Sequence, residues 1–185
     1  MVTDKKELRS RLKKLRDEMS ANERKEKSSA ICRTVSGLKE YINASQLLCY
    51  AAIGSEADMT ELINSALLSG KKVALPKTEN GIIRFYTVNS LEKLEKGMYN
   101  IPEPPKYAET ADILSESICI VPAIGFDCEC NRIGYGKGYY DAFLRDYKGV
   151  AVIAAFSCSL VKKIPSEPHD IAALMAVTES CIYKK

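Results

Sequence analysis

The chain has 185 residues, of which 46% are hydrophobic and 28% charged, so it fits one globular domain and excludes a disordered protein. The formal charge of +3 is too small to indicate a nucleic-acid partner, whereas anionic small molecules remain candidate ligands. The seven cysteines are an odd number, and several stand in apolar runs, which favours reduced and mostly buried thiols in a cytoplasmic protein.

The domain organisation follows from what the chain lacks. No apolar run reaches membrane-spanning length, and the N-terminal residues are charged from Asp4 onward without an apolar signal region. We therefore expect no membrane partner and no secretory signal. One domain should span residues 1–185, with a helical part over 1–37 and an α/β core over 46–185, acting as a monomer.

Apolar residues at helical spacing predict a first helix over residues 4–19. The stripe that should face the core consists of Leu8, Leu12, Leu15 and Met19. We interpret the basic residues of this helix as a solvated face, with the alternative that one or two of them reach an anion. These residues are Lys5, Lys6, Arg9, Arg11, Lys13, Lys14 and Arg16.

A second helix should begin at Ser20, where Glu23 completes a capping box, and end at Gly37. After it, the apolar run Gln46–Ile53 has the length of a buried strand. Glu56 follows this strand on a loop of the kind that holds ligands in parallel sheets. As an alternative, Glu56 is simply an acid that favours the dipole of the next helix.

That next helix should begin at Asp58 as its N-cap, with Glu61 at the capping-box position. Lys71–Leu75 is then a strand, which Pro76 should close. Strand, helix and strand form a βαβ unit, which predicts a parallel sheet with a right-handed crossover.

The next segments are shorter. Alternation over Ile82–Val88 predicts an edge strand, and Leu91–Lys96 reads as a short helical piece. Residues 98–105 are too rich in proline for a helix or a central strand, so we expect an ordered loop across the sheet.

Three further strands are predicted at Ser117–Phe126, Gly149–Phe156 and Ala173–Thr178, with a turn or short helix at Ser159–Ile164. Together these elements predict an α/β fold: a single-domain three-layer sandwich, Rossmann-like, whose mainly parallel central sheet is flanked by helices. Asp170 ends a second proline-broken loop and is either a turn cap or a metal ligand.

The segment from Arg132 to Asp141 is where the sequence predicts chemistry. Its alternate glycines allow backbone N–H groups to approach a ligand closely, and Arg132 and Lys137 add positive charge. A helix predicted over Tyr140–Tyr147 adds its N-terminal partial charge, and Asp141 offers an oxygen ligand suited to Mg²⁺. We infer a nucleotide-phosphate site, in which losing Lys137 should weaken phosphate binding about tenfold to a hundredfold.

The glycine spacing matches neither a P-loop nor a dinucleotide fingerprint. A tight structural connection between strand and helix is therefore the alternative to a phosphate site. Of the two tyrosines at the helix start, Tyr139 and Tyr140, one should face the core and the other the site.

Residues 125–141 as a whole, Gly-Phe-Asp-x-x-x-x-Arg-x-Gly-Tyr-Gly-Lys-Gly-Tyr-Tyr-Asp, resemble the signature of the 5-formyltetrahydrofolate cyclo-ligase family. The resemblance extends through the N-terminal Lys5-x-x-x-Arg9, the Glu56-x-Asp58 turn, Leu75-Pro76, residues 101–104 and His169-Asp170, in the family's order. Cys130 departs from it, because the family usually has glycine there.

The resemblance implies ATP- and Mg²⁺-dependent closure of 5-formyltetrahydrofolate, possibly polyglutamylated, to 5,10-methenyltetrahydrofolate with release of ADP and phosphate. Phosphorylation of the formyl oxygen would be followed by attack of the N10 nitrogen. Arg132, Lys137 and Tyr139 would serve the chemistry, and Asp141 and Asp170 would hold Mg²⁺.

The resemblance also implies binding residues. ATP would contact Lys5, Arg9, Arg132, Ile133, Gly134, Tyr135, Gly136, Lys137, Gly138, Tyr139 and Tyr140. The folate would contact Ala51, Glu56, Tyr135, Gly136, Lys137, Gly138 and Tyr139. Two other functions remain open: a sugar-phosphate isomerase that needs no ATP, and a non-catalytic module that binds a nucleotide or folate.

Overall fold

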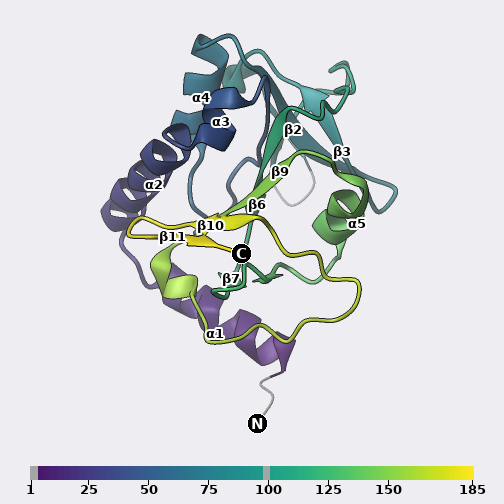
Figure 1. Ribbon diagram of the computed structural model, residues 1–185. Helices are drawn as coiled ribbons and strands as arrows, with labels where there is room; N and C mark the ends of the chain where they lie inside the picture. The colour runs from purple at the N-terminus through teal and green to yellow at the C-terminus, as the bar shows by residue number, and fades with distance from the viewer. Residues whose placement is uncertain (1–3, 98–100) are drawn as a thin grey trace.

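The computed structural model describes residues 4–97 and 101–185, and seven strands of this part of the chain form the main sheet, of order β11-β10-β9-β6-β1-β2-β3 (Figure 1). Its five central strands are parallel: β1 (Gln46–Leu48), β2 (Lys72–Glu79), β6 (Ser117–Pro122), β9 (Val150–Ala154) and β10 (Met175–Val177). The antiparallel edges are β3 (Ile82–Thr87) and β11 (Ile182–Lys184). The mainly parallel α/β sheet is confirmed.

Helices lie on both faces of the sheet (Figure 1). They are α1 (Lys5–Asp17), α2 (Ala21–Ser36), α3 (Lys39–Asn43), α4 (Thr60–Leu68) and α5 (Tyr139–Asp146). The start and end of α2 are as predicted, because the Ser20 side chain accepts from the Glu23 amide and Gly37 is the C-cap.

The two faces carry different clusters because side chains alternate along each strand. Leu47 and Ile118 pack with α2, α3 and α4, whereas their neighbours Leu48 and Cys119 pack with Leu144 of α5. Burial on both faces explains the continuous apolar runs in the sequence. The three-layer arrangement is confirmed.

Strand β1 is shorter than the predicted Gln46–Ile53, and β2 is longer than the predicted Lys71–Leu75. Beyond Leu48 the chain leaves the sheet toward a loop. Pro76 does not close β2, because β1 pairs with β2 only as far as Ala74. Among the described residues, β2 pairs beyond Ala74 with β3 alone. Proline is therefore tolerated at position 76, because no described strand lies on the other side of β2 to receive an N–H from it.

Helix α4 begins one residue later than predicted. Its N-cap is Met59, and Asp58 instead accepts hydrogen bonds from the backbone and hydroxyl of Thr60, 2.9 and 2.7 Å away. Glu61 is not part of a capping box, because its carboxylate accepts from the hydroxyl of Ser29 on α2.

The proline-rich region also differs from the prediction. Only Leu91–Lys93 is helical, and β4 (Glu95–Lys96) pairs with β5 (Pro102–Glu103) in a small ribbon. Pro102 opens β5, a position where proline removes no internal ladder bond. Residues 98–100 of the predicted loop lie outside the described residues.

The predicted strand Ser117–Phe126 is two strands. β6 ends at Pro122, and β7 (Gly125–Phe126) forms a hairpin with β8 (Arg132–Ile133). The short turn lies at Ser157–Ser159, just before its expected place.

The helix α3 and the edge strand β11 were also not predicted, because each is too short to show a period. All seven cysteines are free thiols, of which Cys128 and Cys181 are exposed. Within residues 4–97 and 101–185, no helix is both long and apolar enough to cross a membrane.

Candidate active site

The β7–β8 hairpin delivers Arg132, and Asp127 shapes its turn. The buried Asp127 carboxylate accepts hydrogen bonds from the amides of Glu129, Asn131 and Ile164. Cys130, in the same turn, has a φ of 60°. This left-handed conformation favours glycine, which gives a physical reason for glycine at this position of the family signature.

Residues 134–138 form the glycine loop between β8 and α5. Gly136 and Gly138 have φ angles of 88° and 69°, which side chains with a Cβ rarely adopt. A Cβ on Gly136 would also lie 3.2 Å from the guanidinium of Arg9. Arg9 reaches the loop from α1 and donates from Nε to the carbonyl of Gly134 at 2.7 Å. Lys137 is exposed at the tip.

Arg132 and Asp141 form an ion pair at the start of α5, with 2.8 Å between Nη2 and Oδ1. The same Asp141 oxygen accepts from the amide of Ile171 at 3.2 Å, so it lies against the end of the loop that contains Asp170. Nε of Arg132 is buried and has no hydrogen-bond partner among the described residues. A buried donor without a partner favours an acceptor supplied by a ligand.

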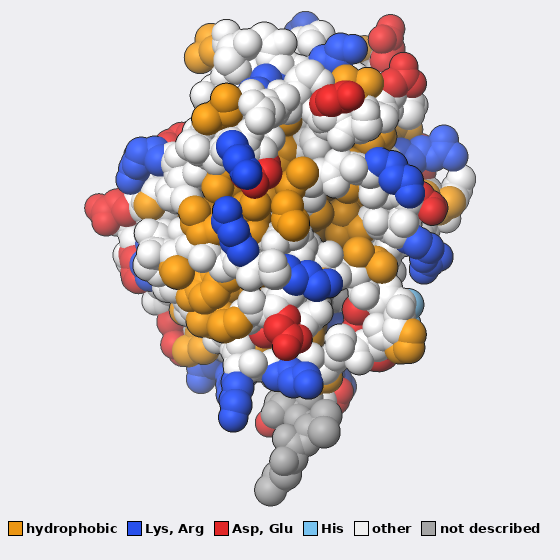
Figure 2. Space-filling view, in the orientation of Figure 1, with side chains coloured by type: hydrophobic (Ala, Val, Ile, Leu, Met, Phe, Trp, Pro, Cys, Tyr) orange, Lys and Arg blue, Asp and Glu red, His pale blue; other side chains and the backbone are white. Residues whose placement is uncertain are grey.

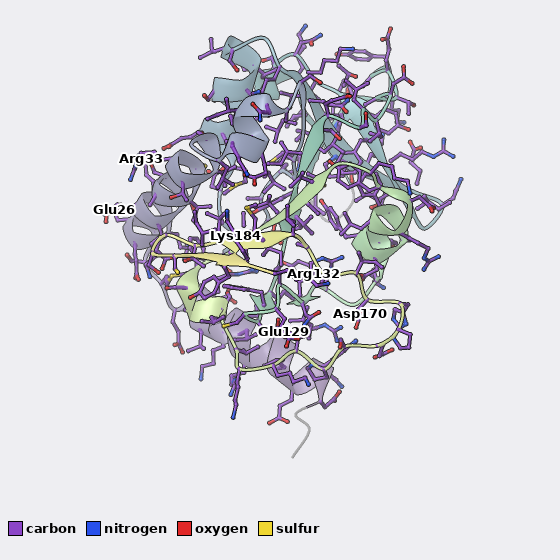
Figure 3. All side chains as sticks on the ribbon, viewed as in Figure 1. Glu26, Arg33, Glu129, Arg132, Asp170 and Lys184 are labelled. Carbon is purple, nitrogen blue, oxygen red and sulfur yellow. The ribbon has the colours of Figure 1, made fainter. Side chains whose placement is uncertain are left out.

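Lys5 brings the first turn of α1 to that same loop. Its ammonium lies 2.8 Å from Asp170 and 2.9 Å from Glu167. Burial lowers the pKa of Lys5, but the two hydrogen-bonded carboxylates outweigh it and raise the pKa overall. Figure 3 shows Arg132 and Asp170 on this side of the molecule, below β10.

The two acids retain oxygen atoms for a metal ion. Oδ2 of Asp141 and Oδ1 of Asp170 accept no hydrogen bond from the described part of the chain. Across the same residues, no cluster of three or more His, Cys, Asp or Glu could enclose a metal. Mg²⁺ commonly binds one or two carboxylates together with water and substrate phosphates, so this pair fits an ion shared with a nucleotide.

Glu56 is a further acidic residue of the candidate site, on the segment between β1 and α4. Its side chain is 7% exposed, and its Oε2 accepts from the amide of Ile53 at 3.0 Å. Burial raises the pKa of Glu56, against the opposing effects of the Ile53 amide, the Arg16 charge and the Tyr135 hydroxyl. Ala51 lies in the same loop and is half-buried.

Arg16 corrects the interpretation of α1 as having a solvated basic face. It is 2% exposed, whereas Leu15, predicted to face the core, is 42% exposed. The buried face follows the spacing of Leu8, Leu12 and Arg16, each four residues apart. That spacing indicates a buried position 16, but the groups that accept from a charged side chain there are distant in the sequence, so the burial of Arg16 was not predicted.

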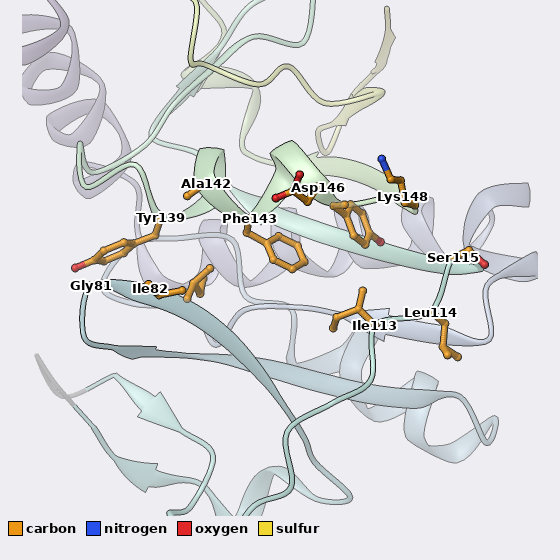
Figure 4. A pocket seen from close by; sticks show the side chains of 12 residues that line it. Gly81, Ile82, Ile113, Leu114, Ser115, Tyr139, Ala142, Phe143, Asp146 and Lys148 are labelled. Carbon is orange, nitrogen blue, oxygen red and sulfur yellow. The ribbon is translucent and has the colours of Figure 1, made fainter.

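The two tyrosines at the start of α5 have different surroundings. Tyr140 packs against the core with its hydroxyl buried. Tyr139 lines a cavity of about 500 Å³ between α5 and β3, whose walls include Ile82, Ile113 and Phe143 (Figure 4). This cavity is largely apolar. It includes Tyr139, which directly follows the glycine loop, but neither Arg132 nor Lys137.

The surface charge agrees with the small net charge of the chain. Figure 2 shows Lys and Arg interspersed with Asp and Glu around apolar side chains, without one large patch of a single sign on this face.

The geometry can now be compared with known proteins. The model of the 5-formyltetrahydrofolate cyclo-ligase family matches residues 1–179. The chain belongs to this family. A 5-formyltetrahydrofolate cyclo-ligase of Mycolicibacterium smegmatis is 30% identical over 184 residues, covering 94% of this chain and 93% of that protein. The Mus musculus 5-formyltetrahydrofolate cyclo-ligase is 26% identical, covering 89% of this chain and 88% of that protein.

Solved structures agree with the family assignment. The 5,10-methenyltetrahydrofolate synthetase of Aquifex aeolicus superposes with a TM-score of 0.86 at 32% identity, covering 97% of this chain and 92% of that chain. The synthetase of Mycoplasma pneumoniae gives a TM-score of 0.78 over 96% of this chain and 99% of that chain. At 19% identity, this second match supports the fold alone.

The contacts above link most of the residues expected at the family's site. These are Lys5, Arg9, the glycine loop, Arg132 and the acids Asp141 and Asp170. Glu56 joins them through Tyr135, whose hydroxyl interacts with the Glu56 carboxylate. Ala51 lies in the same segment as Glu56 and stays a prediction as a site residue.

Proposed function

We propose that the protein catalyses the ATP- and Mg²⁺-dependent closure of 5-formyltetrahydrofolate to 5,10-methenyltetrahydrofolate, with release of ADP and phosphate. The observation that carries this proposal is the meeting of Arg9 from α1 with the glycine loop, beside the buried carboxylate of Glu56. An anion site and a buried hydrogen-bond acceptor at one loop suit a nucleotide held against a pterin ring.

For ATP, the proposed contacts are Lys5 and Arg9 on α1 and residues 132–140. Backbone N–H groups of the glycine loop and the start of α5 would bind phosphate oxygens, since a helix N-terminus favours negative charge. The unpartnered Nε of Arg132 supports an acceptor at that point. Lys137, exposed and close to the loop's centre, would bind a phosphate as a mobile point charge.

For the folate, the proposed contacts are Ala51, Glu56 and residues 135–139. The Glu56 carboxylate can accept hydrogen bonds from the amino and N–H groups of the pterin ring. Because this carboxylate is buried, a ligand that lacks these donors would leave it without hydrogen-bond partners. The free-energy cost of that loss favours a pterin over ligands without such donors.

In the proposed reaction, the γ-phosphoryl group passes to the formyl oxygen, the N10 nitrogen of the same folate attacks the activated carbon, and phosphate leaves. Arg132 and Lys137 would stabilise negative charge on the transferred group, and Tyr139 would orient it from the start of α5. Positioning and charge stabilisation are the main contributions of a protein to phosphoryl transfer. No protein nucleophile is needed.

Asp141 and Asp170 would hold Mg²⁺ directly or through water. When bound, the ion would supply charge neutralisation at the phosphates. Lys5, which contacts Asp170, would bind a phosphate oxygen of ATP with its ammonium group. We further propose that one domain, residues 1–185, acts as a monomer and accepts folates that carry polyglutamate tails.

The test is a growth of methenyl-folate absorbance when the reduced protein, Mg²⁺, ATP and 5-formyltetrahydrofolate are mixed. ADP should form in equal amount to the folate product. An absorbance change that does not require ATP would contradict the proposal and favour a different enzyme, while tight folate binding without ADP would indicate a binding module.

A further inference from the structure

Arg16 is a buried cation that the proposed reaction does not use. Its Nε donates to the Ser55 hydroxyl at 3.0 Å, Nη1 to the carbonyl of Ala123 at 3.4 Å, and Nη2 to the Tyr135 hydroxyl at 3.2 Å. Among the described residues, no Asp or Glu oxygen lies within the 4.0 Å of an ion pair with this guanidinium. Burying a charge without an ionic partner costs free energy, which hydrogen bonds to the charged group offset only in part.

Each hydroxyl that Arg16 contacts also interacts with a carboxylate. The Ser55 hydroxyl donates to Asp17, which follows Arg16 on α1. The Tyr135 hydroxyl interacts with Glu56. Arg16 therefore reaches two acids through hydroxyl groups, and a hydroxyl that accepts from a cation is a stronger donor to an anion.

The second of these paths joins three separate elements. Arg16 belongs to α1, Tyr135 to the glycine loop, and Glu56 to the loop that follows β1. A shift of the glycine loop moves the Tyr135 hydroxyl, and with it the interaction of Glu56 with Arg16. The path thus connects the proposed ATP loop to the proposed pterin acceptor.

We propose that Arg16 is a positioning residue that acts through the Tyr135 hydroxyl to keep Glu56 ionised and oriented toward the folate. The inference rests on the proposed function, because it assumes that Glu56 accepts from the substrate. Arg16 itself is 2% exposed, so it would act on a ligand through the Tyr135 hydroxyl and through the direct attraction of its charge for Glu56.

Protonation of Glu56 gives the inference a second observable. Burial raises the pKa of this carboxyl, while Arg16 and Tyr135 oppose the rise. The charge of Glu56 in turn helps to raise the pKa of the buried tyrosines Tyr50 and Tyr140. Removing the Tyr135 hydroxyl should raise the pKa further. The ionised acceptor would then be lost at a higher pH as the solution is acidified.

The decisive variant is Tyr135→Phe, which removes the hydroxyl and keeps the ring. Its KM for 5-formyltetrahydrofolate should rise about two- to tenfold near neutral pH, the effect of one hydrogen bond. The rise should be larger in acid, and the KM for ATP should change less. Arg16→Lys, which keeps the charge but not the fork that reaches both hydroxyls, should change the pH profile in the same direction.

Combining the two substitutions should add little to the larger single effect, because both break the same path. Tyr86→Phe is the matched control, since the Tyr86 hydroxyl also bonds a carboxylate, Glu79, at 2.7 Å on the β2–β3 hairpin. This control should retain the native KM values and pH profile.

Two results would overturn the inference while the native protein remains active. One is a native folate KM for Tyr135→Phe at every pH. The other is an equal rise of both KM values together with a lower unfolding temperature, which would indicate a purely structural role. If the native protein shows no activity, the proposed function fails. In that case, calorimetry would measure the affinity of the native protein and of Tyr135→Phe for 5-formyltetrahydrofolate. Equal affinities, or no binding to either protein, would reject the role of Arg16 and Tyr135.

Discussion

Nε of Arg9 donates a 2.7 Å hydrogen bond to the carbonyl of Gly134, so the first helix is fastened to the glycine loop by a side chain at the proposed phosphate site. The guanidinium also fills the space that a Cβ on Gly136 would need. One arginine therefore both carries charge to the loop and fixes its conformation.

Replacing Arg9 should weaken ATP binding. We expect Arg9→Ala to raise the KM for ATP about ten- to a hundredfold, because a charge-assisted hydrogen bond and the loop geometry are lost together. Steady-state kinetics with ATP varied at saturating folate would measure it. Arg11→Ala is the matched control, since Arg11 is exposed on the same helix. Equal effects of the two changes would argue for general charge and against a specific contact.

The metal assignment can be tested with Asp141→Asn. We expect turnover to fall at least about tenfold and the Mg²⁺ concentration for half-maximal activity to rise, because one carboxylate ligand becomes neutral. A Mg²⁺ titration at saturating ATP would measure both. Asp146→Asn, an exposed acid in the last turn of α5, serves as control. Native activity of Asp141→Asn at low Mg²⁺ would remove Asp141 from the metal site.

Glu56→Gln should separate the two substrates. The amide keeps the shape but loses the charge, so we expect the folate KM to rise about tenfold or more and the ATP KM to change little. The acid limb of the folate pH profile should also flatten, because Glu56, whose pKa is raised by burial, is the group that is ionised above that pKa and neutral below it. Equal losses for ATP and folate would contradict the assignment.

The buried face of α1 makes a prediction about stability. Leu12 packs in a cluster with Leu8, Ile124, Ile133 and Ile164. We expect Leu12→Ala to lower the free energy of unfolding by about 2–5 kcal/mol, the cost of a cavity in a core. Leu15→Ala should cost less than about 1 kcal/mol, since Leu15 is 42% exposed. Chemical denaturation would measure both, and the reverse order would show that the helix face is wrong.

The fold could be read from the sequence where burial leaves a local pattern. The runs around Gln46–Leu48, Ser117–Pro122 and Val150–Ala154 are almost continuously apolar because helices cover both faces of the parallel sheet. The glycine loop and α5 were predicted for a similar reason, since turn residues, charges and helical spacing are all local signals.

Other features depend on partners that are distant in the sequence. Pro76 continues β2 only because β1 has already ended, and Arg16 is buried only because Ser55, Ala123 and Tyr135 supply acceptors. The helical spacing of leucines therefore predicted that Leu15 is buried. Hydrogen bonds to distant residues instead stabilise Arg16 in the buried position. The contacts of Asp170 with Lys5 were likewise outside the reach of any local pattern.

The pairing of Lys5 with Asp170 spans 165 positions of the chain, which affects how the protein is made. A ribosome releases the first helix long before it synthesises the loop that the helix must meet. A chain whose synthesis has not reached Asp170 therefore lacks one side of the proposed nucleotide site. Ligand present during refolding can stabilise only the finished molecule, so nucleotide should slow unfolding without speeding the early steps of folding.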